Sequence, residues 1–242
     1  MTIHYFDTLD STNNYCKLLD PKTVEEFMVV CACCQTAGIG QQGNVWVSEP
    51  YKNLTFSIIL KPSFLLASEQ YLLTMMLAVA TADAVASLLS DYSVDIKWPN
   101  DIYVGERKIC GILTTNRIHD SHITQSICGI GLNVNQTNFP EWLPNPTSLK
   151  ALSGNDFNID NILKPVLSSI DKYYQLLKED HDEIRHLYLS RLFRKGIQAS
   201  YEYLGIKIEA TITGVDRFGH LQLTSSDGKE ICCDMKEVKY IL

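Results

Sequence analysis

Residues 71–89 form a long apolar stretch that constrains the fold of this chain more than any other segment. The stretch, YLLTMMLAVATADAVASLL, approaches the length of a membrane-spanning helix, which needs about 20 apolar residues. Asp83 and three hydroxyl-bearing residues interrupt it, and alanine is plentiful. A helix of this composition is typical of a protein core, where it packs against a sheet. We therefore predict a core helix near 68–90 and no association with a membrane.

Strand-like segments lie on both sides of this helix. The predicted strands of the main sheet are 3–6, 27–34, 54–60, 94–98, 102–104, 108–116 and 124–133. A short helix over 13–19, capped by Asp10 or Ser11, follows the first strand. From 155 to 194, apolar residues recur at steps of three and four, which predicts two helices against the sheet. Strands gathered with few helices between them favour an α+β fold with a mixed, largely antiparallel sheet.

The sequence changes character beyond Gly196. Short predicted strands at 206–213, 221–224 and 230–234 are separated by turn sequences rich in Asp and Gly. Some forty residues of hairpins have the size of a small barrel, which would be marginally stable alone and is expected to dock on the main domain. We place the boundary near Lys195, which gives domains 1–195 and 196–242.

Charge and cysteine content exclude several classes of protein. A net charge of −7 leaves no basic surplus for coating nucleic acid. The eight cysteines lie mostly among apolar neighbours, as buried thiols do, and the Cys31/Cys34 C-x-x-C has no second pair of similar spacing to complete a zinc site. The first residues have no basic and apolar leader pattern. We predict a cytoplasmic protein with no metal site built from its own residues.

One candidate for ligand binding is the glycine-rich segment 35–46, which ends in Trp46. Glycines allow backbone N–H groups to approach an anion, and an indole offers a flat face for stacking. The spacing matches neither a Walker A motif nor a dinucleotide fingerprint. Taken alone, the segment is equally compatible with a mobile hairpin.

A second candidate joins Lys97-Trp-Pro-Asn-Asp101 to Lys108 and the residues after it. Two lysines on neighbouring strands and one carboxylate would meet at one place, which suits a reaction that develops negative charge on phosphate or carboxylate oxygens. The alternative is a tight turn in which Asn100 and Asp101 bond to the backbone and the lysines are solvated. Gly129-Ile-Gly131-Leu-Asn133 forms a third group, which indicates either a close approach to the backbone or a bulge.

In this order, these groups resemble the motifs of the biotin protein ligases, and the resemblance covers nearly the whole chain. The most specific match is Lys97-Trp-Pro-Asn-Asp-Ile followed by Lys108-Ile-Cys-Gly-Ile-Leu at the family's separation. Ser11-Thr-Asn13 and the glycine loop also match. The resemblance implies a class II synthetase-like catalytic domain over 1–195 and an SH3-like β-barrel over 196–242.

The implied activity has two half-reactions in one site. Biotin and ATP, with Mg²⁺, give biotinyl-5'-AMP and pyrophosphate, and a lysine of a biotin carboxyl carrier protein then displaces AMP. Some family members carry a DNA-binding domain ahead of the catalytic part, whereas here the Ser-Thr-Asn motif begins at Ser11, so no DNA binding is expected. Family members often dimerise through the sheet edge, which makes a homodimer one expectation.

The resemblance also assigns roles to residues of this chain. Lys108 would bind biotin's carboxylate and then the adenylate phosphate, Lys97 would assist electrostatically, and Asp101 would orient the cations or accept a proton from the incoming amine. The implied biotin-binding residues are Ser11, Thr12, Asn13, Gln35, Gly38, Gly40, Gln41, Lys108, Gly111 and Leu113. The implied ATP-binding residues are Trp46, Asn100, Gly131 and Asn133.

Two alternatives to a competent biotin ligase stay open, and departures from the family pattern support the first of them. Ile39 replaces the arginine of the family's Gly-Arg-Gly, Gln41 replaces a second basic residue, and Thr115 stands where an acidic residue is frequent. An isoleucine cannot replace a guanidinium facing a carboxylate or phosphate. The chain is therefore compatible with reduced activity, with leakage of the adenylate, or with a degenerate biotin-binding relative that lacks catalysis. A lipoate or octanoate ligase-transferase of the same fold is the other alternative.

Overall fold

The computed structural model describes residues 1–242 apart from the side chain of Gln42. Among the described residues, seven strands form one sheet in the order β1-β2-β3-β7-β6-β5-β4. The strands are β1 (Ile3–Leu9), β2 (Met28–Gln35), β3 (Leu54–Leu60), β4 (Val94–Lys97), β5 (Asp101–Val104), β6 (Arg107–His119) and β7 (His122–Leu132). Only the β1–β2 pair of these described strands is parallel, so the predicted mixed, largely antiparallel sheet is confirmed.

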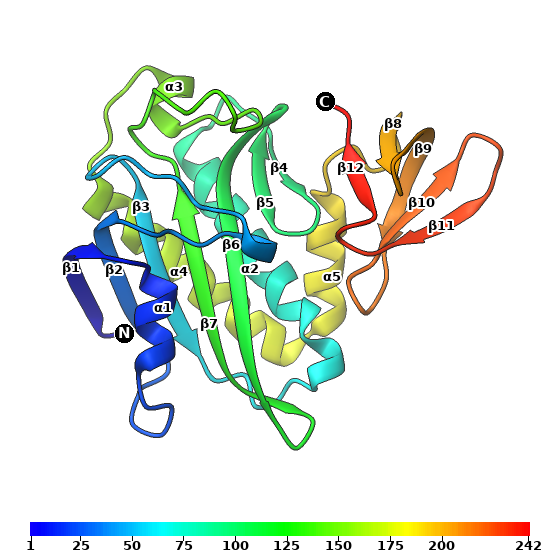
Figure 1. The fold of residues 1–242 in the computed structure, drawn as a ribbon. Coiled ribbons are helices and arrows are strands. Elements are labelled where there is room, and N and C mark those ends of the chain that lie inside the picture. Colours follow the sequence, from blue (N-terminus) through cyan, green and yellow to red (C-terminus); the bar gives the residue numbers. More distant parts are fainter.

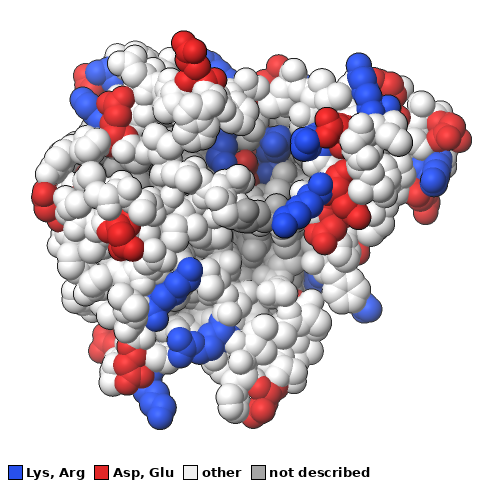
Figure 2. Space-filling view, in the orientation of Figure 1, with Lys and Arg blue, Asp and Glu red and all other residues white. Residues whose placement is uncertain are grey.

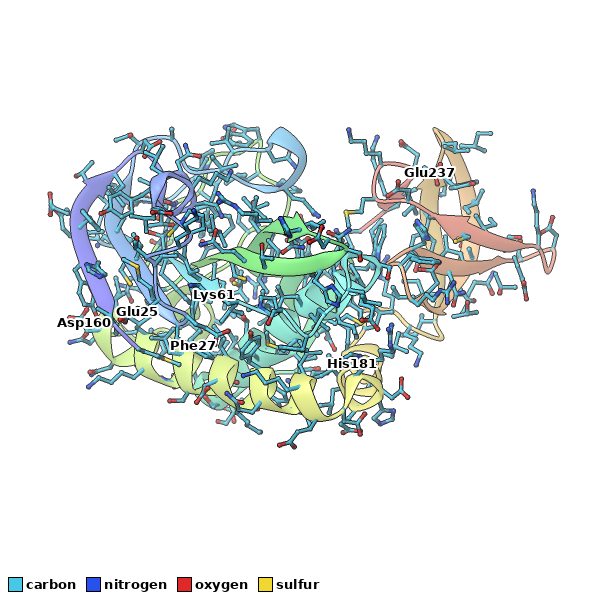
Figure 3. All side chains as sticks on the ribbon, turned by 90° about the horizontal axis from the view of Figure 1, so that it is seen from below. Glu25, Phe27, Lys61, Asp160, His181 and Glu237 are labelled. Atoms are coloured by element: carbon cyan, nitrogen blue, oxygen red, sulfur yellow. The ribbon has the colours of Figure 1, made fainter. Side chains whose placement is uncertain are left out.

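Helices cover the two faces of this sheet unequally (Figure 1). Helix α1 (Thr12–Leu18) lies alone on one face, and the opposite face carries α2 (Tyr71–Leu88), α4 (Ile159–Glu179) and α5 (His181–Ser190). In Figure 3, helix α4 runs along the sheet from the end marked by Asp160 to the end near His181, which is the first residue of α5. The layer of α2, α4 and α5 leaves the other face of β6 and β7 free to form a binding site.

The apolar stretch is a core helix, as predicted. Within α2, Leu72, Leu73, Met76 and Leu77 have no exposed surface. The helix would be long and apolar enough to cross a membrane, but its most apolar window is 72% buried inside the protein. Burial of a large apolar side chain contributes about 1.5–3 kcal/mol, so α2 is a major source of stability.

The C-terminal residues form a separate antiparallel sheet in the order β11-β10-β9-β8-β12. Its strands are β8 (Gln198–Tyr203), β9 (Ile206–Val215), β10 (Leu221–Ser225), β11 (Glu230–Cys233) and β12 (Val238–Tyr240). The sheet lies beside the end of the large one and is marked by Glu237 in Figure 3. Its inner face, including Tyr201, Ile212 and Leu221, belongs to the same apolar cluster as α2. The two parts therefore share a core.

Most of the cysteines are buried, as predicted, but three are not. Five are buried, at positions 16, 31, 110, 128 and 233, but Cys33 and Cys232 are exposed and Cys34 is half-buried. Side chains alternate between faces along a strand, so an apolar run at the end of a strand does not bury every residue in it.

Two short helices, α3 (Leu149–Ser153) and the 3-10 turn η1 (Gln41–Gly43), were not predicted, and a second 3-10 turn, η2 (Ala67–Glu69), precedes α2.

Candidate active site

A cavity of about 360 Å³ opens on the face of β6 and β7 that α2 does not cover. Its walls come from the start of α1, the segment 39–46, the β4–β5 corner and the last residues of the chain. Figure 2 shows Lys or Arg and Asp or Glu atoms together in the hollow near the centre of this face. Most of the residues predicted for the site line the cavity: Ser11, Thr12, Asn13, Gln35, Gly40, Gln41, Trp46, Lys97, Asn100, Asp101, Lys108, Gly111, Leu113 and Gly131.

The polar end of the cavity is built at the N-terminus of α1. Ser11 is the N-cap, and its hydroxyl accepts from Asn14 N. The backbone N–H of Thr12 donates to Gln35 Oε1 over 2.8 Å, and the Thr12 and Ser57 hydroxyls are 2.8 Å apart. These bonds tie the start of α1 to β2 and β3.

Asn13 contributes the unmatched polar group at this end. Asn13 is only 3% exposed. Within the described part of the chain, neither its Oδ1 nor its Nδ2 has a hydrogen-bond partner. A buried amide without partners costs about 1–3 kcal/mol, so such a group indicates a ligand that completes it. A cyclic urea, which has N–H donors and a carbonyl acceptor, matches both atoms of the Asn13 amide.

The charged centre of the cavity comes from three strands. Lys97 ends β4, Asp101 begins β5 as its register partner, and Lys108 lies near the start of β6. Lys108 Nζ is 2.7 Å from Asp101 Oδ1, with both side chains partly exposed. The prediction that the two lysines lie on neighbouring strands is wrong, because β5 lies between β4 and β6. The turn alternative holds only for Asn100, whose amide donates to the carbonyl of Ile112.

Lys97 is held between two aromatic rings. Its Nζ lies 5.2 Å from the centre of the Tyr103 ring and 4.7 Å from that of Tyr240. Burial lowers the pKa of Lys97, Asp101 opposes this shift, and Lys108 and Arg194 reinforce it. The rings favour the charged ammonium through cation–π attraction, which offsets part of the cost of burial.

Trp46 lies over the glycines of the central strands. A Cβ added at Gly131 would be 2.3 Å from Trp46 Cε2, and one added at Gly111 would be 3.1 Å from Cζ3. Gly131 therefore leaves the space that the indole fills, and Gly111 is in close contact with it. Lys108 Nζ is 5.7 Å from the centre of the Trp46 ring system, so the indole and the lysine share one end of the cavity.

Two predicted residues lie outside the cavity lining. Gly38 supports the segment 39–46: its carbonyl accepts from Trp46 N, and a Cβ there would be 2.4 Å from the carbonyl oxygen of Trp46. Asn133 is buried, and its amide donates to the carbonyl of Thr147 over 2.9 Å. Both residues shape neighbouring backbone in this structure.

Sequence reasoning missed the contribution of the C-terminal sheet and tail to this cavity. Met235, Val238, Lys239, Tyr240 and Leu242 line it, and Gln41 Nε2 donates to Met235 Sδ over 3.0 Å. No local pattern marks these residues, because their place depends on how the C-terminal sheet docks. Tyr103, which lies two positions after Asp101 on the same strand, could have indicated an aromatic ring beside Lys97.

Comparison with known proteins identifies relatives of this arrangement. The family model described as "Biotin/lipoate A/B protein ligase family" matches residues 5–133. The "Bifunctional ligase/repressor BirA" of Bacillus subtilis is 30% identical over 228 residues, which cover 93% of this chain and 70% of that protein. The human "Biotin--protein ligase" is 26% identical over 217 residues, or 84% of this chain and 29% of that protein.

A solved structure extends the likeness to the whole fold. The "Biotin protein ligase from Aquifex aeolicus in complex with biotin and ATP" superposes with a TM-score of 0.82 at 26% identity and covers 99% of both chains. The match includes the C-terminal sheet as well as the domain that carries the cavity. The chain belongs to the biotin/lipoate A/B protein ligase family.

Proposed function

We propose that this protein is an ATP-dependent biotin protein ligase, which activates biotin as biotinyl-5'-AMP and transfers the biotinyl group to a lysine of a carrier protein. The observation that carries this proposal is the pairing, in one cavity, of the partnerless Asn13 amide with the cations Lys97 and Lys108. The Aquifex relative binds biotin and ATP, which are the ligands that these two ends of the cavity suit.

The start of α1 fits the ureido ring of biotin. Asn13 can donate to the ring carbonyl and accept from a ring N–H, which satisfies both of its atoms. The lipoate alternative fits less well, because a dithiolane ring offers no donor or strong acceptor to a buried amide. Ser11, Thr12 and Gln35 hold Asn13 in place through the bonds that tie α1 to β2 and β3.

The first half-reaction joins two anions. A carboxylate oxygen of biotin attacks the α-phosphorus of ATP, the bond from that phosphorus to the bridging oxygen breaks, and pyrophosphate leaves. We assign Lys108 to the carboxylate and the developing charge on the α-phosphate, with Lys97 beside it. Fixed cations in a site that excludes water lower the barrier more than they would in solvent. Trp46 covers the nucleotide side and protects the mixed anhydride from water.

The second half-reaction needs a neutral amine. The carrier lysine attacks the acyl carbon, the bond between that carbon and the phosphate oxygen breaks, and AMP leaves. Asp101 shares one oxygen with Lys108, and we assign its other oxygen to accept the proton that the amine loses.

The lining residues do not form a magnesium site of their own. Among the described residues of the cavity wall, Asp101 is the only Asp or Glu, and Lys108 already pairs with it. Mg²⁺ is usually held by one or two carboxylates together with substrate phosphates. The predicted Mg²⁺ would therefore enter on the nucleotide, and no step above depends on it.

Two finer features belong to the same proposal. We infer that the five-stranded C-terminal sheet is a small SH3-like barrel, which its strand number and its hairpin turns support.

We propose that two copies pair through the sheet edge at β1, because the other outer strand, β4, is bridged by Leu192. Light scattering of the purified chain tests the dimer.

The proposal is tested by biotin-dependent release of pyrophosphate from ATP, with lipoate and octanoate in parallel reactions. A ligase for biotin releases pyrophosphate with biotin and loses this activity in Lys108→Ala. Release with lipoate or octanoate but not with biotin would replace the proposal by the lipoate alternative. Saturable biotin binding with no release would favour the non-catalytic relative.

A further inference from the structure

Three side chains with different donor atoms meet on the C-terminal sheet and do not line the cavity. Asp216 follows β9, His220 precedes β10, and Cys232 lies on β11. Their donor atoms all lie within 4.8 Å of one another. His220 Nδ1 is 2.8 Å from Asp216 Oδ2, and Cys232 Sγ is 4.0 Å from the same oxygen.

The strand register brings these residues to one accessible face. Cys232 is the register partner of Gln222, and His220 lies two residues before Gln222, so all three side chains share a face. Asp216 lies opposite His220, because the N–H of Asp216 donates to the carbonyl of His220. Gln222 and Cys232 are exposed, and Asp216 and His220 are half-buried, so an ion from solution can reach the cluster.

The carboxylate is oriented by the turn and not by the other two ligands. Oδ1 of Asp216 accepts from Phe218 N over 2.8 Å and from His220 N over 2.9 Å. This leaves Oδ2 directed at the imidazole and the thiol. The turn needs Gly219, whose φ is +96°. A hairpin corner explains the Asp216–His220 pair, but it does not require a thiol from the next strand.

Although the sequence predicted no metal site, we propose that Asp216, His220 and Cys232 form a binding site for a transition-metal cation of the Zn²⁺ class. Thiolate, imidazole and carboxylate together suit Zn²⁺, whereas Mg²⁺ and Ca²⁺ prefer oxygen ligands alone. Three protein ligands leave a fourth tetrahedral position for water. The two hairpins that supply the ligands would be joined by the ion.

This site adjoins the support of the catalytic corner. The carbonyl of Gly219 accepts from Trp98 Nε1 over 2.9 Å, and Gly219 lies against the ring of Tyr71. The Tyr71 hydroxyl donates to the carbonyl of Pro99 over 3.1 Å. Trp98 and Pro99 lead directly into Asn100 and Asp101. An ion that fixes the turn at Gly219 would therefore also fix the segment that carries Asn100 and Asp101. An effect of the ion on biotin ligation rests on the proposed function, whereas the binding of the ion does not.

The test uses the full chain, freed of metal by a chelator, with Zn²⁺ in competition with a chromophoric chelator and with Co²⁺ as a spectroscopic probe. We expect one Zn²⁺ per chain and, with Co²⁺, a thiolate-to-metal charge-transfer band. Cys232→Ser abolishes the band, and Cys232→Ser and His220→Asn each weaken Zn²⁺ binding at least tenfold, since even outer partners of metal ligands are worth about 10- to 100-fold. Cys33→Ser, which removes an exposed thiol elsewhere, leaves both measurements unchanged.

Thermal unfolding separates binding from a folding defect. In chelator, Cys232→Ser and Cys33→Ser should unfold at the wild-type midpoint, and Zn²⁺ should raise the midpoint of wild type and Cys33→Ser only, because a ligand that binds the native state stabilises it. A Co²⁺ band that persists in Cys232→Ser, or Zn²⁺ binding that is equal in all chains, would overturn the site. None of these measurements uses biotin or ATP, so their outcome is independent of the proposed function.

Discussion

Replacing Gly131 by alanine tests whether Trp46 closes the nucleotide end of the cavity. The new Cβ would be 2.3 Å from Trp46 Cε2 and 2.6 Å from Nε1, distances at which one partner must move. The strand cannot easily yield, because Gly131 is paired with Thr55 on β3 and with Gly111 on β6. The indole should therefore leave the sheet and take its loop with it.

The expected size of this effect follows from the cost of overpacking. Inserting a methyl group into filled space costs about 1–3 kcal/mol, which corresponds to roughly 5- to 150-fold in an equilibrium. We expect kcat/KM for ATP in pyrophosphate release to decrease by a factor within this range. Biotin affinity should change by less than about threefold, because Asn13 is not displaced. The free energy of unfolding should fall by no more than this cost, because the displaced ring belongs to a loop.

The matched control is Gly129→Ala, two residues earlier on the same strand. Its Cβ would lie 3.4 Å from Asn13 Nδ2 and 3.5 Å from Ser57 Oγ, which are ordinary contacts. This variant should fold normally but reduce the space at the urea-binding end, so that biotin affinity falls while the indole stays in place. In a Trp142→Phe background only Trp46 and the buried Trp98 remain, so a change in fluorescence between Gly131→Ala and Gly129→Ala reports the Trp46 ring. If Gly131→Ala keeps ATP kinetics within twofold of wild type, or loses biotin affinity instead, the assigned role of Trp46 is wrong.

Three further predictions concern other parts of the cavity. Asn13→Ala should weaken biotin binding in calorimetry by about 1–3 kcal/mol, and an unchanged affinity would remove Asn13 from the urea site. Ile39→Arg should lower the ratio of free biotinyl-adenylate to biotinylated carrier by roughly 10- to 100-fold, as one charge-assisted contact allows, and an equal ratio would show that the arginine is not what this site lacks. Because burial lowers the pKa of Lys97 below its ordinary 10.5, the native state binds fewer protons than the unfolded chain between the two values, and this group's contribution to stability rises with pH there. The free energy of urea unfolding of wild type minus that of Lys97→Met should therefore increase as the pH rises toward 10.5, and a constant difference would contradict the direction of the shift.

Local pattern predicted the main sheet and its helices because their residues carry their own periodicity. The apolar run of β3 was predicted at its observed bounds, Leu54–Leu60. Strands β8 and β12 were missed. Strand β12 has only three residues and exists by pairing with β8. Pairing between segments far apart in sequence leaves no mark in a short window, so such strands emerge only in the folded chain.

The candidate site was predictable where its residues are close in sequence. Lys97, Asp101 and Lys108 meet because successive antiparallel strands return the chain to the same place. Tyr240 reaches Lys97 only because the C-terminal sheet docks beside the β4–β5 corner, which no motif encodes. The partnerless state of Asn13 is likewise visible only in the structure, although the Ser-Thr-Asn sequence pointed to the residue itself.

The most direct test of the central claim follows one carrier domain by mass spectrometry. The purified chain is incubated with biotin, Mg-ATP and a biotin carboxyl carrier domain, beside Lys108→Ala and a carrier whose acceptor lysine is replaced by arginine. The account predicts one biotinyl group on the acceptor lysine, formed only when biotin and ATP are both present, and little or none with either replacement. An unmodified carrier, with neither pyrophosphate released by the wild-type chain nor activity restored by Ile39→Arg, would contradict it.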